Sequence, residues 1–278
     1  MIVETRRHGS VALYSRLLFS VFPPIGELRC AMSNANNSGD AMGENPLARK
    51  YHELAELAGS LAHEIKSPLS VIRMNMELLA EDHRDTTTSE GRRALAKMEV
   101  VQHQCTRLEN LLNDFLKFVG LRDLDLVAGN LNDHINRVLD LFTPQANDAD
   151  VEIVRYLDPD LPSVQLNSET LQAALINLVK NSLEAMPGGG QLIARTRESR
   201  SGVALDLIDT GNGMDEQTAI KMFDAFFTTK EDGSGLGLPT ARKIIEAHGG
   251  WIGVQSEVGR GTQFTLEFPL PARIAASS

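Results

Sequence analysis

A histidine and a glutamate stand side by side in the segment AHEIKSPLSVI, shortly before a proline. A neutral imidazole at His63 can act as a nucleophile, and Glu64 can hold the ring tautomer or accept its proton. At about 100° per residue, His63 and Ser67 both face away from the apolar stripe of the helix that we expect here. Pro68 removes a helical hydrogen bond, which predicts a kink in the turn that carries His63. An isolated pair of this kind is more often a solvated surface histidine, so its interpretation depends on the rest of the chain.

Two asparagines occupy one face of a second expected helix, in the segment INLVKNSLEA. Asn177 and Asn181 are four residues apart, and their amide oxygens are donors that can ligate Mg²⁺ without adding charge. Asparagine is a poor helix former, so two of them in mid-helix carry a cost that suggests a purpose. The alternative is a pair of solvent-facing asparagines.

A carboxylate and two glycines follow an expected strand in LDLIDTGNGMD. Asp209, at a buried strand end, can accept a hydrogen bond from an exocyclic amine such as that of adenine. Gly211 and Gly213 let the backbone approach a flat ring. Taken alone, this pattern is equally typical of a common turn.

A glycine-rich segment, FFTTKEDGSGLGLPTARKI, precedes another expected helix. Gly233, Gly235 and Gly237, with Leu236 between the last two, leave N–H groups exposed at a helix N-terminus, which favours phosphate binding. Lys230 is placed to meet a terminal phosphate. The segment does not match the P-loop pattern, so a P-loop nucleotide site is excluded.

Two long amphipathic helices are expected to carry the histidine. Apolar residues recur at steps of three or four in the first helix, at Leu54, Leu57, Leu61, Ile65, Leu69, Ile72, Met76 and Leu79. A second stripe comprises Leu95, Met98, Cys105, Leu108, Leu112, Phe115 and Val119. This periodicity predicts an antiparallel helical hairpin with an exposed apolar seam. Pairing two copies into a four-helix bundle would bury the seam, so we expect a homodimer.

Strands and helices are mixed in the rest of the chain. Helices are expected at 130–149, 168–186, 215–224 and 238–248, and the first three strands at about 151–158, 163–167 and 189–199. A further strand ends at Asp209, and the C-terminal segment from Gly250 to Leu270 predicts a hairpin. Because the elements do not alternate strictly, we expect an α+β layer and not a doubly wound fold.

Composition limits the possible functions. The chain has 278 residues and a net charge of −10, which argues against a broad nucleic-acid-binding surface but allows small phosphate sites. The two cysteines suit a reducing compartment, and we expect Cys105 to be buried in a helix. No apolar run reaches the length of a membrane span. We therefore expect a cytoplasmic protein without a transmembrane segment.

The ordered motifs resemble those of bacterial two-component sensor histidine kinases. AHEIKSPL, NLVKNSLEAM, DTGNGMD, MFDAFFTTK, GSGLGLPTARKI and HGGWIGVQSEVGRGTQFTLEFP occur in the family's order over roughly residues 50–270. FFTTK and the short glycine segment are similar to the nitrogen-regulator branch. The resemblance implies a dimeric helical hairpin followed by an α/β sandwich ATP-binding domain of the gyrase, Hsp90 and histidine kinase type.

The resemblance also implies roles for single residues. His63 would be phosphorylated with Glu64 as its base, and Asn181 would bind Mg²⁺ with assistance from Asn177. Asp209 would select adenine, and Lys230 and the glycines at 233–237 would cover the phosphates of ATP.

Two positions depart from the family pattern. Ser67 replaces the usual Thr or Asn, which puts a response-regulator phosphatase activity in doubt. Glu184 replaces the usual Lys and removes one cation from the site.

The expected function is autophosphorylation of His63 from ATP, followed by phosphoryl transfer to an aspartate of a response regulator acting in trans. We expect an extension that is disordered or a linker at 1–46, a phosphoacceptor domain at 47–120, a hinge at 121–129, an ATP-binding domain at 130–270 and a tail at 271–278. An upstream partner or the N-terminal extension would supply the signal. The alternatives are a non-kinase ATPase of the same nucleotide fold and a binding scaffold with a degenerate site.

Overall fold

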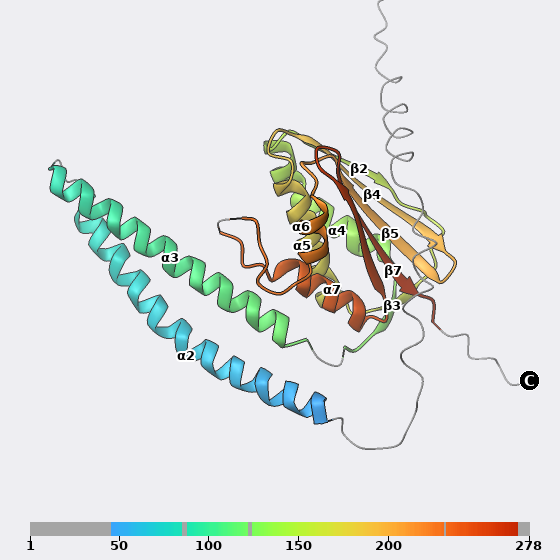
Figure 1. Ribbon diagram of the computed structural model, residues 1–278, viewed down its shortest axis with the longest axis horizontal. Coiled ribbons are helices and arrows are strands. Elements are labelled where there is room, and N and C mark those ends of the chain that lie inside the picture. The colour runs from blue at the N-terminus through green and yellow to red at the C-terminus, as the bar shows by residue number, and fades with distance from the viewer. Residues whose placement is uncertain (1–45, 85–87, 122–123, 231, 272–278) are drawn as a thin grey trace, which may run out of the picture. The chain divides into compact units, whose positions relative to one another are not determined.

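The computed structural model describes residues 46–84, 88–121, 124–230 and 232–271 (Figure 1). Within the first range, the side chains of 46–58, 60, 61 and 63 are also outside the description. The expectation for residues 1–46 therefore lies almost wholly outside the described residues, as does most of the expected tail.

Two long helices form the N-terminal part of the described chain. Helix α2 spans Pro46–Asp82 and helix α3 spans Ser89–Val119. The Thr88 side chain caps α3 by accepting a hydrogen bond from the Gly91 nitrogen at 3.1 Å. The two helices run antiparallel. Lys66 of α2 pairs with Asn113 of α3, whereas Ser70, which comes later in α2, pairs with Glu109, which comes earlier in α3. The predicted antiparallel hairpin is therefore present.

The apolar stripe of α2 is divided between two environments. Leu69 is buried together with Ala62 and, on α3, Cys105, as expected for that cysteine. Exposed fractions of 48%, 44% and 40% remain at Ile65, Ile72 and Leu79, which repeat every seven residues. The hairpin thus buries only part of the stripe and leaves a heptad-spaced apolar row open.

A mixed sheet forms the core of the C-terminal part. Its strand order is β2-β4-β5-β7-β6, with β2 parallel to β4 and all other pairs antiparallel. The bounds are β2 Val151–Tyr156, β4 Gly190–Ser199, β5 Gly202–Asp209, β6 Trp251–Glu257 and β7 Gly261–Pro269. A separate two-stranded sheet pairs β1 (Val127–Gly129) with β3 (Val164–Leu166). Strand β1 lies within the segment that we expected to act as a hinge.

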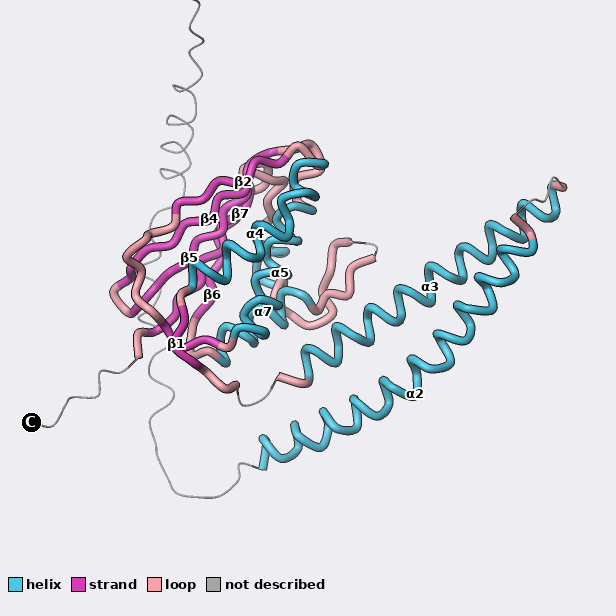
Figure 2. Tube along the Cα trace, turned by 180° about the vertical axis from the view of Figure 1, so that it is seen from behind, coloured by secondary structure: helices cyan, strands magenta, loops and turns pink. Residues whose placement is uncertain are grey.

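Helices cover one face of the five-stranded sheet (Figure 2). They are α4 (Leu131–Asp148), α5 (Ser168–Glu184) and α7 (Gly237–Ala247), and the short α6 (Glu216–Lys221) follows β5. Alternate residues of the strands, such as Leu205 and Leu207 of β5, point into a core that these helices complete. The predicted α+β layer is therefore confirmed, and it presents the end of β5 next to α5.

Asparagine side chains cap the N-termini of two of the helices that cover the sheet. Asn130 caps α4, and Asn167 caps α5 by accepting a hydrogen bond from the Thr170 nitrogen at 3.1 Å. The sequence predicts a capping box that begins at Ser168, and this prediction is wrong, because Ser168 is the first residue inside the helix. None of the described helices combines the length and the apolar character that a membrane span requires.

Candidate functional site

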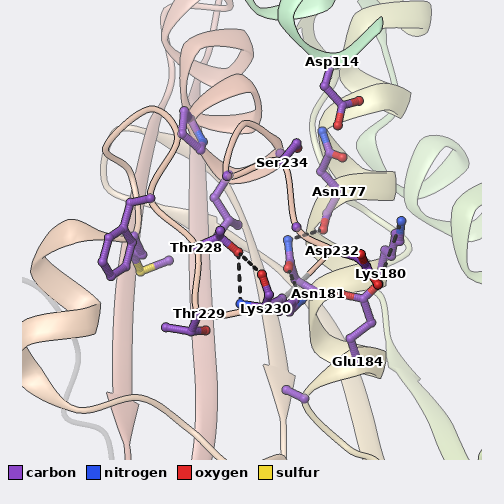
Figure 3. Close-up of a pocket in the computed structure, with 18 of the residues that line it drawn as sticks. Asp114, Asn177, Lys180, Asn181, Glu184, Thr228, Thr229, Lys230, Asp232 and Ser234 are labelled. Atoms are coloured by element: carbon purple, nitrogen blue, oxygen red, sulfur yellow. Dashed lines mark hydrogen bonds and ion pairs between the residues drawn. The ribbon is translucent and has the colours of Figure 1, made fainter. Parts of the chain in front are cut away.

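A pocket of about 910 Å³ opens between α5, the end of β5 and the residues 226–230 and 232–237, which we call the lid loop (Figure 3). Residues of α3, including Asp114, also line it. The predicted site residues that line the pocket are Asn177, Asn181, Asp209, Gly213, Lys230, Gly233, Gly235 and Gly237. The fold therefore gathers three motifs that are separated along the sequence into one site.

Two predicted residues lie next to the pocket and not on its wall. Leu236 is fully buried in the core immediately before α7. Gly211 packs against the backbone of Ala185, where an added Cβ would lie 2.5 Å from the carbonyl oxygen. Both residues support the site from behind and do not face a ligand.

Asp209 lies at the C-terminal end of β5 with 1% of its surface exposed. Its Oδ1 accepts hydrogen bonds from the backbone nitrogens of Gly211 at 3.0 Å and Thr262 at 3.1 Å. Burial raises the pKa of Asp209, and these two N–H groups and the Ser182 hydroxyl act in the opposite direction. A buried carboxylate with one oxygen already occupied leaves Oδ2 to accept a hydrogen bond from a ligand.

Ser182 and Thr262 were not predicted from the sequence, although they complete the surroundings of Asp209. The Ser182 hydroxyl faces the carboxyl group and lowers its pKa by donating a hydrogen bond to it. Thr262 lines the pocket and contributes its backbone nitrogen.

The lid loop is closed at its base by backbone contacts. Phe226 donates its N–H to the Gly235 carbonyl at 3.0 Å and has a φ of 68°, which is rare for a residue with a side chain. Gly235 has a φ of 65°, and an added Cβ would lie 2.5 Å from the Phe226 backbone. Glycine is therefore required at 235 on both conformational and steric grounds.

The N-terminus of α7 follows the lid loop directly. No described side chain caps this terminus, and the first turn of a helix leaves its N–H groups without helical partners. An added Cβ at Gly237 would lie 3.4 Å from the Asn177 Oδ1, so the glycine allows the terminus to approach α5. These N–H groups and the helix dipole make a site for anionic groups such as phosphates.

The amides of α5 are oriented by a hydrogen bond within the helix. The Asn181 Nδ2 donates to the Asn177 carbonyl oxygen at 2.8 Å, which turns the Asn181 Oδ1 toward the pocket. That oxygen accepts a hydrogen bond from the Lys230 Nζ at 2.8 Å. Lys230 also forms an ion pair with Glu184 (Figure 3). An amide oxygen and a carboxylate that converge on an ammonium group have the donor chemistry that Mg²⁺ requires.

The predicted phosphoacceptor residues belong to α2 and do not line this pocket. Glu64 and Ser67 are exposed, and Pro68 lies inside a helix that continues on both sides. The backbone of His63 belongs to this helix, but the predicted direction of its side chain lies outside the described residues.

Two family models match the chain, and they cover the two halves of the described fold. Residues 53–122 match the His Kinase A (phospho-acceptor) domain. Residues 166–272 match the histidine kinase-, DNA gyrase B- and HSP90-like ATPase. The matches place the segment around His63 in the first family and the pocket residues of α5, β5 and the lid loop in the second.

Curated relatives match over most of the chain. Sensor histidine kinase ZraS of Escherichia coli (strain K12) is 33% identical over 221 residues, which cover 80% of this chain and 46% of that protein. Sporulation kinase E of Bacillus subtilis (strain 168) is 32% identical over 220 residues, which cover 79% of this chain and 29% of that protein. The chain therefore spans less than half the length of these relatives.

Solved structures with similar folds include two complexes. Full-length ShkA in complex with AMPPNP has a TM-score of 0.62 and 27% identity, and the match covers 77% of this chain and 45% of that chain. Histidine kinase ThkA in complex with the response regulator protein TrrA has a TM-score of 0.58 and 27% identity, with 80% of this chain and 65% of that chain covered.

Proposed function

This chain belongs to the family of bacterial two-component sensor histidine kinases, and on that premise we propose that it transfers the γ-phosphoryl group of ATP to its own His63. The phosphohistidine then serves as donor to an aspartate of a separate response regulator. The observation that carries this proposal is the single pocket in which Asp209, Asn181 and the N-terminus of α7 converge.

ATP fits this pocket through three contacts that differ in chemistry. The Oδ2 of Asp209 accepts a hydrogen bond from the adenine amine, and the Ser182 hydroxyl lies beside the same carboxyl group. The N–H groups at the start of α7 bind the phosphates, with the lid-loop glycines at 233, 235 and 237 allowing close approach. Bound Mg²⁺ would neutralise phosphate charge, and Asn181, assisted by Asn177, is the residue that we assign to hold it.

The phosphoryl-transfer step uses groups of α2. The unprotonated ring nitrogen of His63 attacks the γ-phosphorus, a nitrogen–phosphorus bond forms, and the bond to the oxygen that bridges the β- and γ-phosphates breaks to release ADP. Glu64 accepts the proton from the other ring nitrogen. Positioning and charge neutralisation supply most of the rate enhancement. In the second step the aspartate oxygen attacks the same phosphorus, and the nitrogen–phosphorus bond breaks.

The two family matches support a separate role for each part of the chain. We assign the phosphoacceptor role to residues 47–120 and nucleotide binding to 130–270, with 121–129 as the hinge between them and 1–46 and 271–278 outside both. The heptad-spaced row on α2 supports a homodimer in which a second copy covers it. The reaction consumes ATP, which supports a cytoplasmic location. Assignment to the nitrogen-regulator branch stays a prediction, as do the nature of the signal and any phosphatase role of Ser67.

The test is incubation of the purified full chain with ATP carrying a radioactive label on either the α- or the γ-phosphate. The proposal predicts a protein-bound label from γ-labelled ATP alone, stable in base and lost in acid. His63→Gln should bind nucleotide normally and acquire no label. Equal labelling of the variant would support a different acceptor, and ATP hydrolysis or binding without any phosphoprotein would support the ATPase or the scaffold alternative.

A further inference from the structure

Two oxygens of α5 and one ammonium group of the lid loop form a closed cluster at the pocket (Figure 3). The Lys230 Nζ donates to the Asn181 Oδ1 at 2.8 Å and pairs with the Glu184 Oε2. Lys230 lies 46 residues from Glu184 in the sequence, so the pair ties the lid loop to the helix. All three residues line the same pocket.

Both oxygens are held in place by contacts on α5 itself. The Asn181 amide is oriented by the bond from its Nδ2 to the Asn177 carbonyl oxygen. The other oxygen of Glu184, Oε1, lies 3.8 Å from the Nζ of Lys180, which is on the preceding turn of the helix. The two remaining oxygens therefore face one point, and a cation already occupies that point.

We propose that Asn181 and Glu184 act as one cation-binding pair, which Lys230 occupies without nucleotide and Mg²⁺ occupies when Mg·ATP binds. This inference rests on the proposed function and names Glu184 as a second ligand of the metal, beside Asn181. Mg²⁺ and an ammonium group repel each other at the distance of a shared ligand, so Lys230 must leave the pair. The phosphates that arrive with the metal offer Lys230 a stronger anionic partner.

Glu184 has opposite effects on nucleotide binding in the two metal conditions. Without Mg²⁺, its carboxylate both repels the phosphates and holds Lys230 away from them, which weakens binding. With Mg²⁺, the same carboxylate attracts the metal and strengthens binding. Glu184 should therefore increase the ratio of the dissociation constant without Mg²⁺ to the dissociation constant with Mg²⁺. This ratio is the gain in affinity that Mg²⁺ gives.

An ordinary surface ion pair would not produce this pattern. The side chains of Lys230 and Glu184 are 44% and 35% exposed, and ion pairs of that exposure contribute little to folding stability. If the pair were purely structural, Glu184→Gln would change the melting temperature only slightly. It would leave the gain in nucleotide affinity from Mg²⁺ unchanged.

The experiment is calorimetric titration of the full chain with AMPPNP, in excess Mg²⁺ and in EDTA. We compare the wild type with Glu184→Gln, Glu184→Asp and Lys230→Gln. The matched control is Glu246→Gln, which removes an exposed glutamate of α7 that pairs with Arg242 and does not line the pocket. Circular dichroism melting curves check that each variant is folded.

Glu184→Gln should bind AMPPNP more tightly than the wild type in EDTA, and its gain from Mg²⁺ should fall by roughly tenfold, as expected for the loss of one charge contact. Glu184→Asp should keep part of the gain. Lys230→Gln should bind more weakly in both conditions, because it loses a phosphate contact when Mg²⁺ is present and leaves the Glu184 charge unpaired when Mg²⁺ is absent. Glu246→Gln should match the wild type.

An unchanged gain in Glu184→Gln, with normal binding by the wild type, would overturn the inference and leave the proposed function intact. Failure of the wild type to bind AMPPNP in either condition would instead overturn the proposed function.

Discussion

The Oδ1 of Asp209, at the end of β5, lies 3.1 Å from the backbone nitrogen of Thr262, which belongs to the neighbouring strand β7. A second N–H, from Gly211, reaches the same oxygen at 3.0 Å. The carboxyl group is thus fixed from two directions although burial raises its pKa. A charge kept in such a place carries a folding cost, and we attribute its presence to adenine recognition.

Asp209→Asn should weaken ATP binding by roughly 100-fold, because the amide can keep both backbone hydrogen bonds but presents N–H donors to the adenine amine. The same change should raise the melting temperature at neutral pH. Calorimetric titration with AMPPNP and thermal melts measure the two effects.

The pH dependence of this stability difference has a defined sign. A raised pKa in the folded state means that folding favours the protonated carboxyl, so wild-type stability falls relative to the variant as the pH rises from the ordinary value of 3.8. Above the raised pKa the difference stays constant. A variant that melts below the wild type at neutral pH would contradict this explanation.

Gly235→Ala should disrupt the lid loop. The added Cβ would lie 2.5 Å from the Phe226 backbone at a φ of 65°, so the loop must move. We expect nucleotide affinity to fall by at least about tenfold, because the phosphate cover is displaced. Binding of a fluorescent ATP analogue measures this effect.

Gly259→Ala is the matched control for the lid substitution. Gly259 also has a positive φ, of 76°, but no atom lies within 4 Å of an added Cβ. The substitution should therefore lower folding stability by about 1–2 kcal/mol and leave nucleotide affinity unchanged. Equal affinities for all three proteins would show that the lid loop does not contribute to the site.

Ile72→Lys should dissociate the proposed homodimer. Ile72 lies in the centre of the row formed with Ile65 and Leu79 and is 44% exposed in the single chain. Each dimer would bury two copies of the new ammonium group, which should weaken dimerisation by roughly 100-fold. Sedimentation velocity over a range of concentrations measures the change.

Met74→Lys provides the comparison, since Met74 is 54% exposed and lies about 200° around the helix from Ile72. This variant should sediment as the wild type does. If both variants remained dimeric, the row would not be the interface.

His134 should make the folding stability of the C-terminal part of the chain decrease at acidic pH. Burial is the main cause that lowers the pKa of His134, and Arg137 and His248 lower it further, whereas Asp133 opposes them. Folding then favours the neutral ring, so stability falls as the pH drops through the ordinary value of 6.5. His134→Gln should flatten the melting temperature between about pH 7.5 and 5.5. Parallel profiles for the two proteins would contradict the assignment.

Patterns of local origin could be predicted from the sequence. The hairpin of α2 and α3 and the strands on both sides of Asp209 follow from periodicity, and the glycine segment follows from its composition. The apolar stripe of α2 was predicted as one seam, but periodicity does not say which partner buries each residue. Leu69 packs inside the hairpin, whereas Ile72 stays 44% exposed.

Contacts between distant segments could not be predicted in the same way. Thr262 contributes a backbone N–H to Asp209, and a backbone donor has no signature in residue type, although the G-R-G-T run marks a tight turn nearby. Asn167 and Ser168 are both good capping residues, so only the backbone shows that Asn167 is the cap. The pairing of Lys230 with Glu184 depends on how the lid loop folds back over α5.

The most direct test of the central claim is to locate the phosphoryl group by mass spectrometry after incubation with Mg·ATP. Digestion with trypsin at neutral pH should release residues 51–66, which contain His52 and His63. Electron-transfer fragmentation can distinguish these two histidines. We predict the added mass of one phosphoryl group on His63 and none on His52. A phosphoryl group on any other residue, with His63 unmodified, would contradict the account.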